Sequence, residues 1–273
     1  MSAAQRIIKY AAIGFALSLI VGIFGGLYIA FGVLGTIFTG SFGMGDGLDI
    51  SKYPDSSYIL SVNLGISQVE IRKGEEFRVD TDNKNVKIKQ DHNKIAITEK
   101  SNNIFDTDDE KIIIYVPDEE FDEIYIANGI GQIKIESLKS KKLTLELGTG
   151  ETEIKELIVT KKTKIKGGVG EVTIKNANLA NVDLELGIGQ FNIEGIFSGE
   201  NDIESGIGEL NIEIQDSKEN YTIETEDGIG EIKIDGYSVG DTKLGKGKTT
   251  LDIESGVGAV NIRFLEKNDS HKF

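Results

Sequence analysis

Acidic and amide residues recur at one fixed place in this sequence, three positions after the first glycine of a repeated unit. Two carboxylates held close together can bind a cation or act as acid and base on a glycosidic bond. If successive units stack in sequence order, Glu151 lies beside Glu171. In the same way, Glu209 lies beside Glu231. The residues at this position are Gln68, Gln132, Glu151, Glu171, Gln190, Glu209, Glu231 and Ala259.

The ordinary explanation of such a column is a solvated polar surface, because most acidic side chains in proteins are exposed and bind nothing. The unit also differs from calcium-binding β-rolls, which repeat G-G-x-G-x-D about every nine residues. We therefore predict no cofactor, no metal ion and no catalytic residue. The four glutamates of the column are the place where a cation would bind if the chain takes one.

A second candidate for chemistry is the segment GYSVG, Gly236 to Gly240, which has the G-x-S-x-G spacing of a hydrolase nucleophile. That motif needs a strand before the serine, a helix after it, and a histidine to accept the proton. The segment DTKLGKG that follows is not helical in character, and the histidines of the chain are His92 and His271. The context of Ser238 thus argues against a hydrolase.

The segment GDTKLGKGKTT, from Gly240, has some of the composition of a phosphate-binding loop. That loop requires G-x-x-x-x-G-K followed by Ser or Thr, between a strand and a helix. If Gly245 and Lys246 are the G-K pair, Gly247 occupies the Ser/Thr position. If Gly247 and Lys248 are the pair, Thr242 occupies the position of the first glycine. We interpret the segment as a turn that widens the last repeat.

The charge of the chain is unevenly distributed. Of 30 basic residues only Arg6 and Lys9 precede residue 46, and no acidic residue does, so 28 basic and 45 acidic residues follow, a net charge of −17. So negative a surface repels nucleic acid and anionic lipid, and neither is an expected partner. The chain has no cysteine, which excludes disulfides and cysteine-ligated metals.

The N-terminal region predicts a membrane anchor. Residues 10–38 carry no charge, and these 29 residues exceed the ~20 needed to span a bilayer. A cleavable signal has an apolar run of only roughly 7–15 residues, so an uncleaved anchor is favoured over a removable signal. Because Arg6 and Lys9 precede the run and acids follow it, we expect a single-pass protein with a cytoplasmic N-terminus and an extracytoplasmic C-terminal domain.

Small residues in the predicted anchor recur every four positions, which lets two helices approach closely. They are Gly14, Ser18, Gly22, Gly26 and Ala30. Such spacing also arises by chance in a Gly- and Ala-rich segment, so both a homo-oligomer through the anchor and a simple lipid-facing helix remain open. We assign residues 1–38 to the anchor and residues 39–57, rich in Gly and Ser, to a flexible linker.

The remainder of the chain predicts an all-β fold, a single-stranded β-solenoid of about 8–10 coils with ~19–20-residue repeats. Successive first glycines from Gly129 to Gly206 are 19, 20, 19 and 19 residues apart, and the next two gaps are 22 and 28. Apolar residues alternate before and after each glycine, as expected of strands with one buried face. The first glycines are Gly65, Gly129, Gly148, Gly168, Gly187, Gly206, Gly228 and Gly256.

Several details of the solenoid follow. The solenoid domain is assigned to residues 58–266 and a polar tail to 267–273, while the long gap between Gly65 and Gly129 predicts further strands in a first coil or a hairpin-bearing cap. Asn192 and Asn211 stand at equivalent positions and predict a short amide ladder. The units with Ser67, Thr149 and Thr152 depart from the pattern and are expected to pack more loosely.

The segment KIIIYVPDEEFDEIYIANGIGQIKIESLKSKKLTLELGTGETEI, with the Gly-x-Gly-acid units that follow it, resembles the bacterial putative-adhesin family, also called toastrack domains. The resemblance covers about residues 58–265. It implies a single-stranded β-solenoid, commonly membrane-tethered and linked with the cell envelope or its stress responses. It supplies no catalytic residue to carry over.

From these observations we expect a non-catalytic, membrane-anchored module with an adhesin-like or envelope-sensing role, bound to an envelope or signalling protein. A cytoplasm-facing regulator of an envelope-stress system is the alternative. A polysaccharide-acting β-helix enzyme is the remote alternative, since the central coils are compact, Trp is absent and aromatic content is only 7%.

Overall fold

The computed structural model describes residues 58–91, 93–99 and 111–265. No helix within those ranges is long and apolar enough to cross a membrane. The predicted anchor, its small-residue ridge, the linker, the polar tail and both histidines lie outside the described residues. Those predictions therefore remain predictions.

The described residues form β-strands and one short 3-10 turn, as the alternating apolar pattern predicts. The strands are β1 Ile59–Leu64, β2 Gln68–Lys73, β3 Arg78–Thr81, β4 Val86–Asp91, β5 Lys94–Glu99, β6 Lys111–Val116, β7 Phe121–Ile135, β8 Leu138–Ile154, β9 Leu157–Lys166, β10 Val169–Ala180, β11 Val182–Glu185, β12 Ile188–Ser198, β13 Glu200–Glu204, β14 Ile207–Ile214, β15 Tyr221–Glu226, β16 Ile229–Ile234, β17 Tyr237–Val239, β18 Thr242–Gly245, β19 Thr249–Glu254 and β20 Val257–Phe264, with the 3-10 turn η2 at Lys218–Asn220 between β14 and β15.

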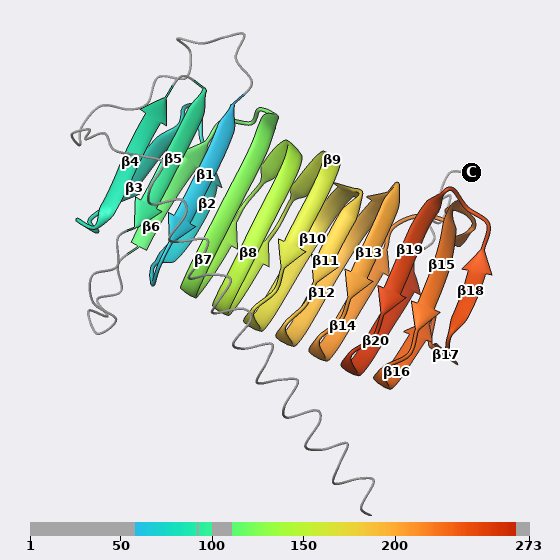
Figure 1. Ribbon diagram of the computed structural model, residues 1–273. Coiled ribbons are helices and arrows are strands. Elements are labelled where there is room, and N and C mark those ends of the chain that lie inside the picture. The colour runs from blue at the N-terminus through green and yellow to red at the C-terminus, as the bar shows by residue number, and fades with distance from the viewer. Residues whose placement is uncertain (1–57, 92, 100–110, 266–273) are drawn as a thin grey trace, which may run out of the picture. The chain divides into compact units, whose positions relative to one another are not determined.

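Each coil of the solenoid is a strand, a glycine corner and a second strand running back. In Figure 1 the strands before the corner and the strands after it make two layers that meet at the corner. Coils stack by parallel pairing: Leu145 lies opposite Ile165 before the corner, and Thr173 lies opposite Asn192 after it. A short third run, such as residues 157–159, pairs with its equivalents and closes the coil.

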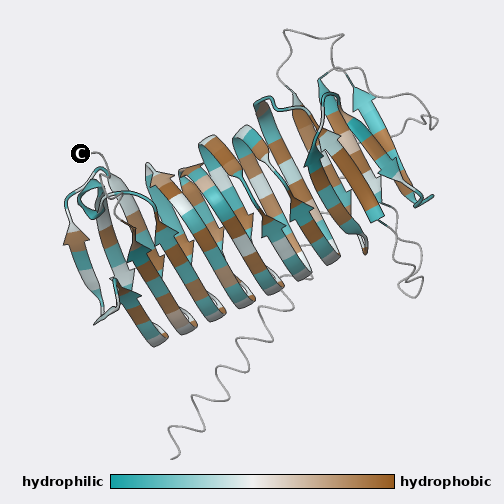
Figure 2. Ribbon diagram, turned by 180° about the vertical axis from the view of Figure 1, so that it is seen from behind, coloured by the Kyte–Doolittle hydropathy of each residue, from teal (hydrophilic) through white to brown (hydrophobic). Residues whose placement is uncertain are grey.

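The space between the layers is filled by columns of aliphatic side chains. Figure 2 shows apolar and polar residues alternating along the strands, which is the pattern of a sheet with one buried face. Ile154, Ile174, Ile193 and Ile212 are at most 2% exposed and follow one another from coil to coil. Burying one such side chain contributes about 1.5–3 kcal/mol, so the repeat supplies its own core.

The coils do not stack in sequence order at either end, which corrects the simple expectation. The strands β1 and β2 lie between β5–β6 and β7, and β19 and β20 lie between β13–β14 and β15–β16. In spatial order the described coils are β5–β6, β1–β2, β7, β8, β9–β10, β11–β12, β13–β14, β19–β20 and β15–β16, which makes nine and agrees with the predicted number.

Antiparallel strands close both ends of the stack. Strands β4 and β3 pair with β5 and β6 at one end, and β18 and β17 pair with β15 and β16 at the other. The gap between Gly65 and Gly129, for which the sequence predicts a first coil or a hairpin-bearing cap, holds both, the coil β5–β6 and the hairpin β4–β5. The pairs β4–β5 and β16–β17 are hairpins, and together with β3 and β18 they place short strands at the two edges, where a long open edge would invite aggregation.

Two columns of glycine form the corner. A Cβ on Gly148 would lie 1.8 Å from the carbonyl oxygen of Gly129, so the first column is required by close approach of the backbones. Gly170, in the second column, has φ of 142°, a conformation that disfavours any side chain. Hydrogen bonds connect the corners, for example from the Ile188 N–H to the Gly168 carbonyl at 2.8 Å.

At the corner of β1–β2 a carboxylate takes over this role. Glu99 Oε2 accepts hydrogen bonds from the backbone N–H groups of Gly65 at 2.7 Å and Ile66 at 3.1 Å, and its Oε1 accepts one from the Ser67 hydroxyl at 2.6 Å. Glu99 thus accepts from the Ile66 N–H, whose equivalents at the interior corners of Ile188 and Ile207 donate to a glycine carbonyl. Nothing in the local sequence around Glu99 predicts this contact.

Candidate interaction surfaces

The predicted glutamate column exists, but its order differs from the expectation. Glu151 lies opposite Glu171, as predicted. Glu209 lies opposite Ala259, and Ala259 lies opposite Glu231, so the expected neighbours Glu209 and Glu231 are separated by a whole coil. The reason is the insertion of β20 between β14 and β16, which sequence order does not reveal.

The side chains of this column are engaged in ordinary surface contacts. Gln132 Nε2 donates to Glu151 Oε2 at 2.7 Å. Glu231 pairs with Lys233 at 2.7 Å and accepts the Ser238 hydroxyl at 2.9 Å, and these two hydrogen bonds, that of Lys233 first, lower the pKa of Glu231. A general acid needs a raised pKa, so Glu231 is poorly suited to that role.

Metal binding is equally unsupported by the geometry. Over the described ranges, no group of three or more His, Cys, Asp or Glu side chains is arranged to hold a metal ion. The four glutamates of the column therefore form no assembled cation site in this part of the chain.

Ser238 lies on the short edge strand β17, which is followed by another strand, β18, in place of a helix. Its hydroxyl donates to the Glu231 carboxylate at 2.9 Å, and the lowered pKa of Glu231 makes this carboxylate a weak acceptor for the serine proton. The loop-like segment from Gly240 forms β18 and the approach to β19. The interpretation of that segment as a turn is therefore wrong, because Thr242–Gly245 is a strand that pairs antiparallel with β15.

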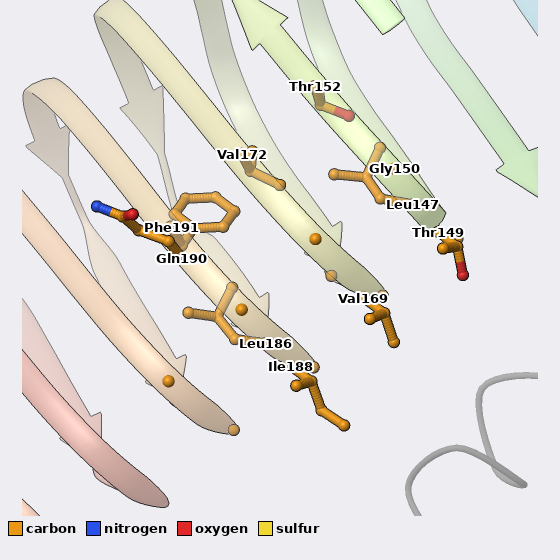
Figure 3. Close-up of a pocket in the computed structure, with 18 of the residues that line it drawn as sticks. Leu147, Thr149, Gly150, Thr152, Val169, Val172, Leu186, Ile188, Gln190 and Phe191 are labelled. Carbon is orange, nitrogen blue, oxygen red and sulfur yellow. The ribbon is translucent and has the colours of Figure 1, made fainter. Parts of the chain in front are cut away.

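A cavity of about 40 Å³ lies beneath the glycine corner, lined by Leu147, Thr152, Val172, Leu186 and Phe191 among others (Figure 3). A single water molecule needs at least ~10–15 Å³, so the cavity could admit water but not an organic substrate. Thr152 is 5% exposed and occupies a core position, where the loose packing predicted for its coil fits the cavity. Thr149 replaces the Ile or Val of the other corners but faces outward, so this replacement leaves the core unchanged.

The amide ladder is confirmed and is longer than predicted. Asn211 Nδ2 donates to Asn192 Oδ1 at 2.9 Å, and Asn261 Nδ2 donates to Asn211 Oδ1 at 2.9 Å. Asn261 was missed because it lies 50 residues from its neighbour in sequence. We call the outward side of the strands after the corner, with Thr173, Asn192, Asn211 and Asn261, the amide face.

The ladder forms the floor of a shallow groove of about 610 Å³. Charged side chains of both signs border this groove: Lys175, Glu194, Glu209, Glu213, Lys233 and Arg263. Arg263 lies 3.4 Å from Glu213, an opposite-charge contact between neighbouring coils. The amide face is thus a hydrogen-bonded surface in which polar groups largely satisfy one another.

The opposite layer carries a different surface that the sequence analysis did not identify. The outward positions two and four residues before the corner glycine are acidic in four adjacent coils, forming two rows of four carboxylates. We call this surface the carboxylate face. One row is Asp183, Asp202, Asp252 and Glu224, and the other is Glu185, Glu204, Glu254 and Glu226.

Cations border the carboxylate face at its ends only. Lys164 contacts Asp183 at 2.5 Å and Glu185 at 3.0 Å, and Lys243 contacts Glu224 at 2.5 Å. Partial burial disfavours the charge of Glu185, but hydrogen bonds from Lys164 and Lys166 outweigh it and lower the pKa of Glu185.

The centre of the carboxylate face lacks such partners. Within the described part of the chain no Lys or Arg forms an ion pair with Asp202, Asp252, Glu204 or Glu254. A sequence signal for these residues was present, since acid-x-acid precedes the corner in NDIESG and LDIESG. The adjacency of those two segments was not visible, because 50 residues separate Asp202 from its partner Asp252.

Nine parallel coils with antiparallel strands at both ends define the described part of the chain as a β-solenoid. The family model of Toastrack DUF4097 matches residues 60–273, and the chain belongs to that family. The resemblance drawn from the Gly-x-Gly-acid units is thereby confirmed. No curated protein matches the chain.

Two solved structures are similar to the chain. One is described as a "putative cell adhesion protein" from Clostridium sporogenes, with 19% identity over 77% of this chain and 93% of that chain and a TM-score of 0.33. The other is described as a "putative adhesin" from Bacteroides fragilis, with 12% identity over 76% of this chain and 93% of that chain and a TM-score of 0.31.

Proposed function

We propose that this protein is a non-catalytic interaction module, anchored in the cell membrane by residues 10–38, with its solenoid outside the membrane in an adhesin-like or envelope-sensing role. The observation that carries the proposal is the architecture itself. Nine stacked coils hold side chains in straight columns on flat faces, which suits recognition of a partner surface better than enclosure of a substrate.

The candidate reactive groups support a binding role. Ser238 and Glu231 bond to each other, and Glu151 bonds to Gln132, so these side chains serve the surface of the fold. Long-range pairing in register makes the faces rigid, and rigid faces bind without a large ordering cost. The expected partner is an envelope or signalling protein, with the carboxylate face favouring a cationic surface.

The anchor and its orientation are part of the proposal. Arg6 and Lys9 precede the uncharged run, and Lys52 is the one basic residue among residues 39–57 that follow it. The positive-inside rule then favours an extracytoplasmic solenoid.

Cysteine labelling tests the orientation, because the chain has no cysteine of its own. The variant Ser238→Cys puts a thiol on an exposed edge strand, and Thr163→Cys, at a fully buried position, is the matched control. A membrane-impermeant maleimide should label Ser238→Cys in intact cells and leave Thr163→Cys unlabelled. Labelling of Ser238→Cys only after lysis would overturn the orientation and favour the cytoplasm-facing regulator.

An activity assay tests the non-catalytic part of the proposal. We expect the full-length chain to release no soluble sugar from bacterial cell-wall polysaccharide. Release that disappears in the variant Glu151→Gln/Glu171→Gln would make the chain a polysaccharide-acting enzyme, since these two acids are opposite each other in neighbouring coils.

A further inference from the structure

The outer side of the glycine corner carries a continuous line of apolar side chains. The residue that follows the first glycine of each corner faces outward, and it is β-branched at Ile66 and in the seven described corners with a second glycine. In Figure 3 the side chains of Thr149, Val169 and Ile188 follow one another at the bend and point away from the strands. We call this line the corner ridge; in spatial order it is Ile66, Ile130, Thr149, Val169, Ile188, Ile207, Val257 and Ile229.

No residue of the ridge is buried in the core, and two of them are exposed. Ile130 is 44% exposed and Ile229 is 55% exposed, while the others are half-buried. Contiguous exposed apolar side chains on a soluble surface commonly mark a site of association.

The fold does not require these positions to be apolar. The corner depends on its glycines, which either approach a neighbouring backbone closely or adopt positive φ. Thr149 occupies one ridge position, so a polar side chain fits the corner. Threonine is also β-branched and suits extended backbone as well as valine or isoleucine does. Strand propensity thus leaves the choice of Ile and Val at the other seven positions unexplained.

Carboxylates lie on both sides of the ridge in its C-terminal half. Before the corner they form a continuous row beside the last four ridge positions, Glu185, Glu204, Glu254 and Glu226, while Lys166 precedes the corner of Val169. After the corner Glu171, Glu209 and Glu231 alternate with the uncharged Gln190 and Ala259. Among the described residues, no Lys or Arg forms an ion pair with Glu171, Glu204, Glu226 or Glu254. This half of the ridge is therefore an apolar line with a continuous acidic margin before the corner and an interrupted acidic margin after it.

The charge of the carboxylates that border the ridge indicates which kind of partner could bind there. A second copy would bring two pairs of negative margins together, and an anionic lipid surface would meet the same repulsion. A segment with an apolar stripe bordered by Lys or Arg matches both the ridge and its margins.

We propose that the C-terminal half of the corner ridge, Val169, Ile188, Ile207, Val257 and Ile229 with its flanking carboxylates, binds a cationic amphipathic segment of a partner protein. This inference rests on the proposed function and names the chemistry of the partner. Five ridge positions at about 4.8 Å per coil span about 19 Å, close to the ~21 Å length of a 14-residue helix.

The test is the binding of a synthetic 14-residue peptide, LKKLLKLLKKLLKL, to the full-length chain in nonionic detergent, measured by fluorescence anisotropy. Its apolar stripe is bordered by lysines. The variant Ile188→Thr/Ile207→Thr should weaken binding about tenfold without changing the circular dichroism spectrum. The variant Glu204→Gln/Glu254→Gln should weaken it by a similar factor and reduce its salt dependence.

Two controls isolate the site. Ile130→Thr, at an exposed ridge position outside the acid-bordered half, should leave binding unchanged. Peptides with every Leu replaced by Ser, or every Lys by Glu, should bind at least about tenfold more weakly. The first lacks the apolar stripe that contacts the ridge, and the second lacks the positive charges that contact the carboxylates.

Binding that is equal in the wild-type chain and both double variants is binding to the detergent or to another surface, and it would overturn the proposal. Equal binding of the Ser-substituted peptide would also overturn it, by showing that charge alone is recognised. Neither result bears on the maleimide labelling, so the inference and the proposed function can fail independently.

Discussion

The amide face and the carboxylate face lie on the two layers of one solenoid, share its core and have the same parallel register, yet they treat neighbouring side chains in opposite ways. On the amide face, Asn192, Asn211 and Asn261 donate to one another along the stack. On the carboxylate face, Asp202 and Asp252 lie opposite each other with like charge.

The difference indicates what each face contributes. Ladders of identical side chains stabilise a stack when each amide donates to the next, because buried or half-buried polar groups are then satisfied. Like charges directly opposite are destabilising. The amide ladder is explained by its contribution to the stability of the fold. The rows of like charges on the carboxylate face do not stabilise the fold, and binding of a cationic partner would explain them.

The largest effect is expected from a substitution at the glycine corner, on which both faces depend. The variant Gly148→Ala places a Cβ 1.8 Å from the Gly129 carbonyl oxygen, and a backbone atom cannot move aside. We expect the free energy of unfolding to fall by more than about 4 kcal/mol, measured by urea denaturation of the full-length chain. Gly240→Ala, whose Cβ would meet only the Asp227 carboxylate at 3.4 Å, is the matched control and should change little.

A smaller effect breaks the amide face alone. The variant Asn211→Ala leaves Asn192 and Asn261 without their shared partner, and we expect a loss of about 1–2 kcal/mol in the free energy of unfolding. The exposed Asn178 provides a matched Asn→Ala substitution with little expected effect. Equal losses in both variants would show that the ladder contributes nothing specific.

An acid on the amide side of the stack gives a prediction with a pH dependence. Hydrogen bonds from Arg72 and then Lys111 lower the pKa of Glu70 from its ordinary 4.5 to about 2. Because the folded-state pKa is depressed, the stabilisation is present above pH 4.5 and is lost as the pH falls toward 2.

The variant Glu70→Gln should therefore lower the free energy of unfolding by about 1 kcal/mol at pH 7, since its half-exposed cation partners are screened by solvent. Its difference from the wild type should shrink below pH 4.5 in denaturation curves recorded across the acid range. A difference that is independent of pH would exclude the ion pairs as its cause.

The smallest expected effect is a gain in stability, and it comes from substitutions on the carboxylate face. The variant Asp202→Asn/Asp252→Asn removes a repulsive contact, so we expect the Tm to rise by about 2 °C at low ionic strength. The rise should disappear in about 1 M salt, where charges are screened within ~3 Å. A fall in Tm would mean that these acids stabilise the fold, and the contrast between the two faces would then be wrong.

Much of this molecule follows from local sequence. The alternation around each glycine predicts strands with one buried face, and the period near 20 predicts coils. The glycine of each corner follows from sterics, as Gly148 shows, and the Asn192–Asn211 contact follows from their equivalent positions one repeat apart.

Where the sequence analysis failed, the missing information was the identity of a distant neighbour. Glu209 and Glu231 occupy equivalent positions in consecutive units, yet Ala259 lies between them. The same insertion adds Asn261 to the amide ladder and sets Asp252 beside Asp202. Glu99 is a further case, since it contacts Gly65 across 34 residues.

The sequence by itself determined the coil, because a coil is specified by a periodic apolar pattern and a glycine corner that act over about 20 residues. Only the tertiary structure decided which coils are neighbours, because parallel strands can pair whenever their residue patterns match, whatever their separation in sequence. The carboxylate face and the acid-bordered half of the corner ridge depend on this order of the coils.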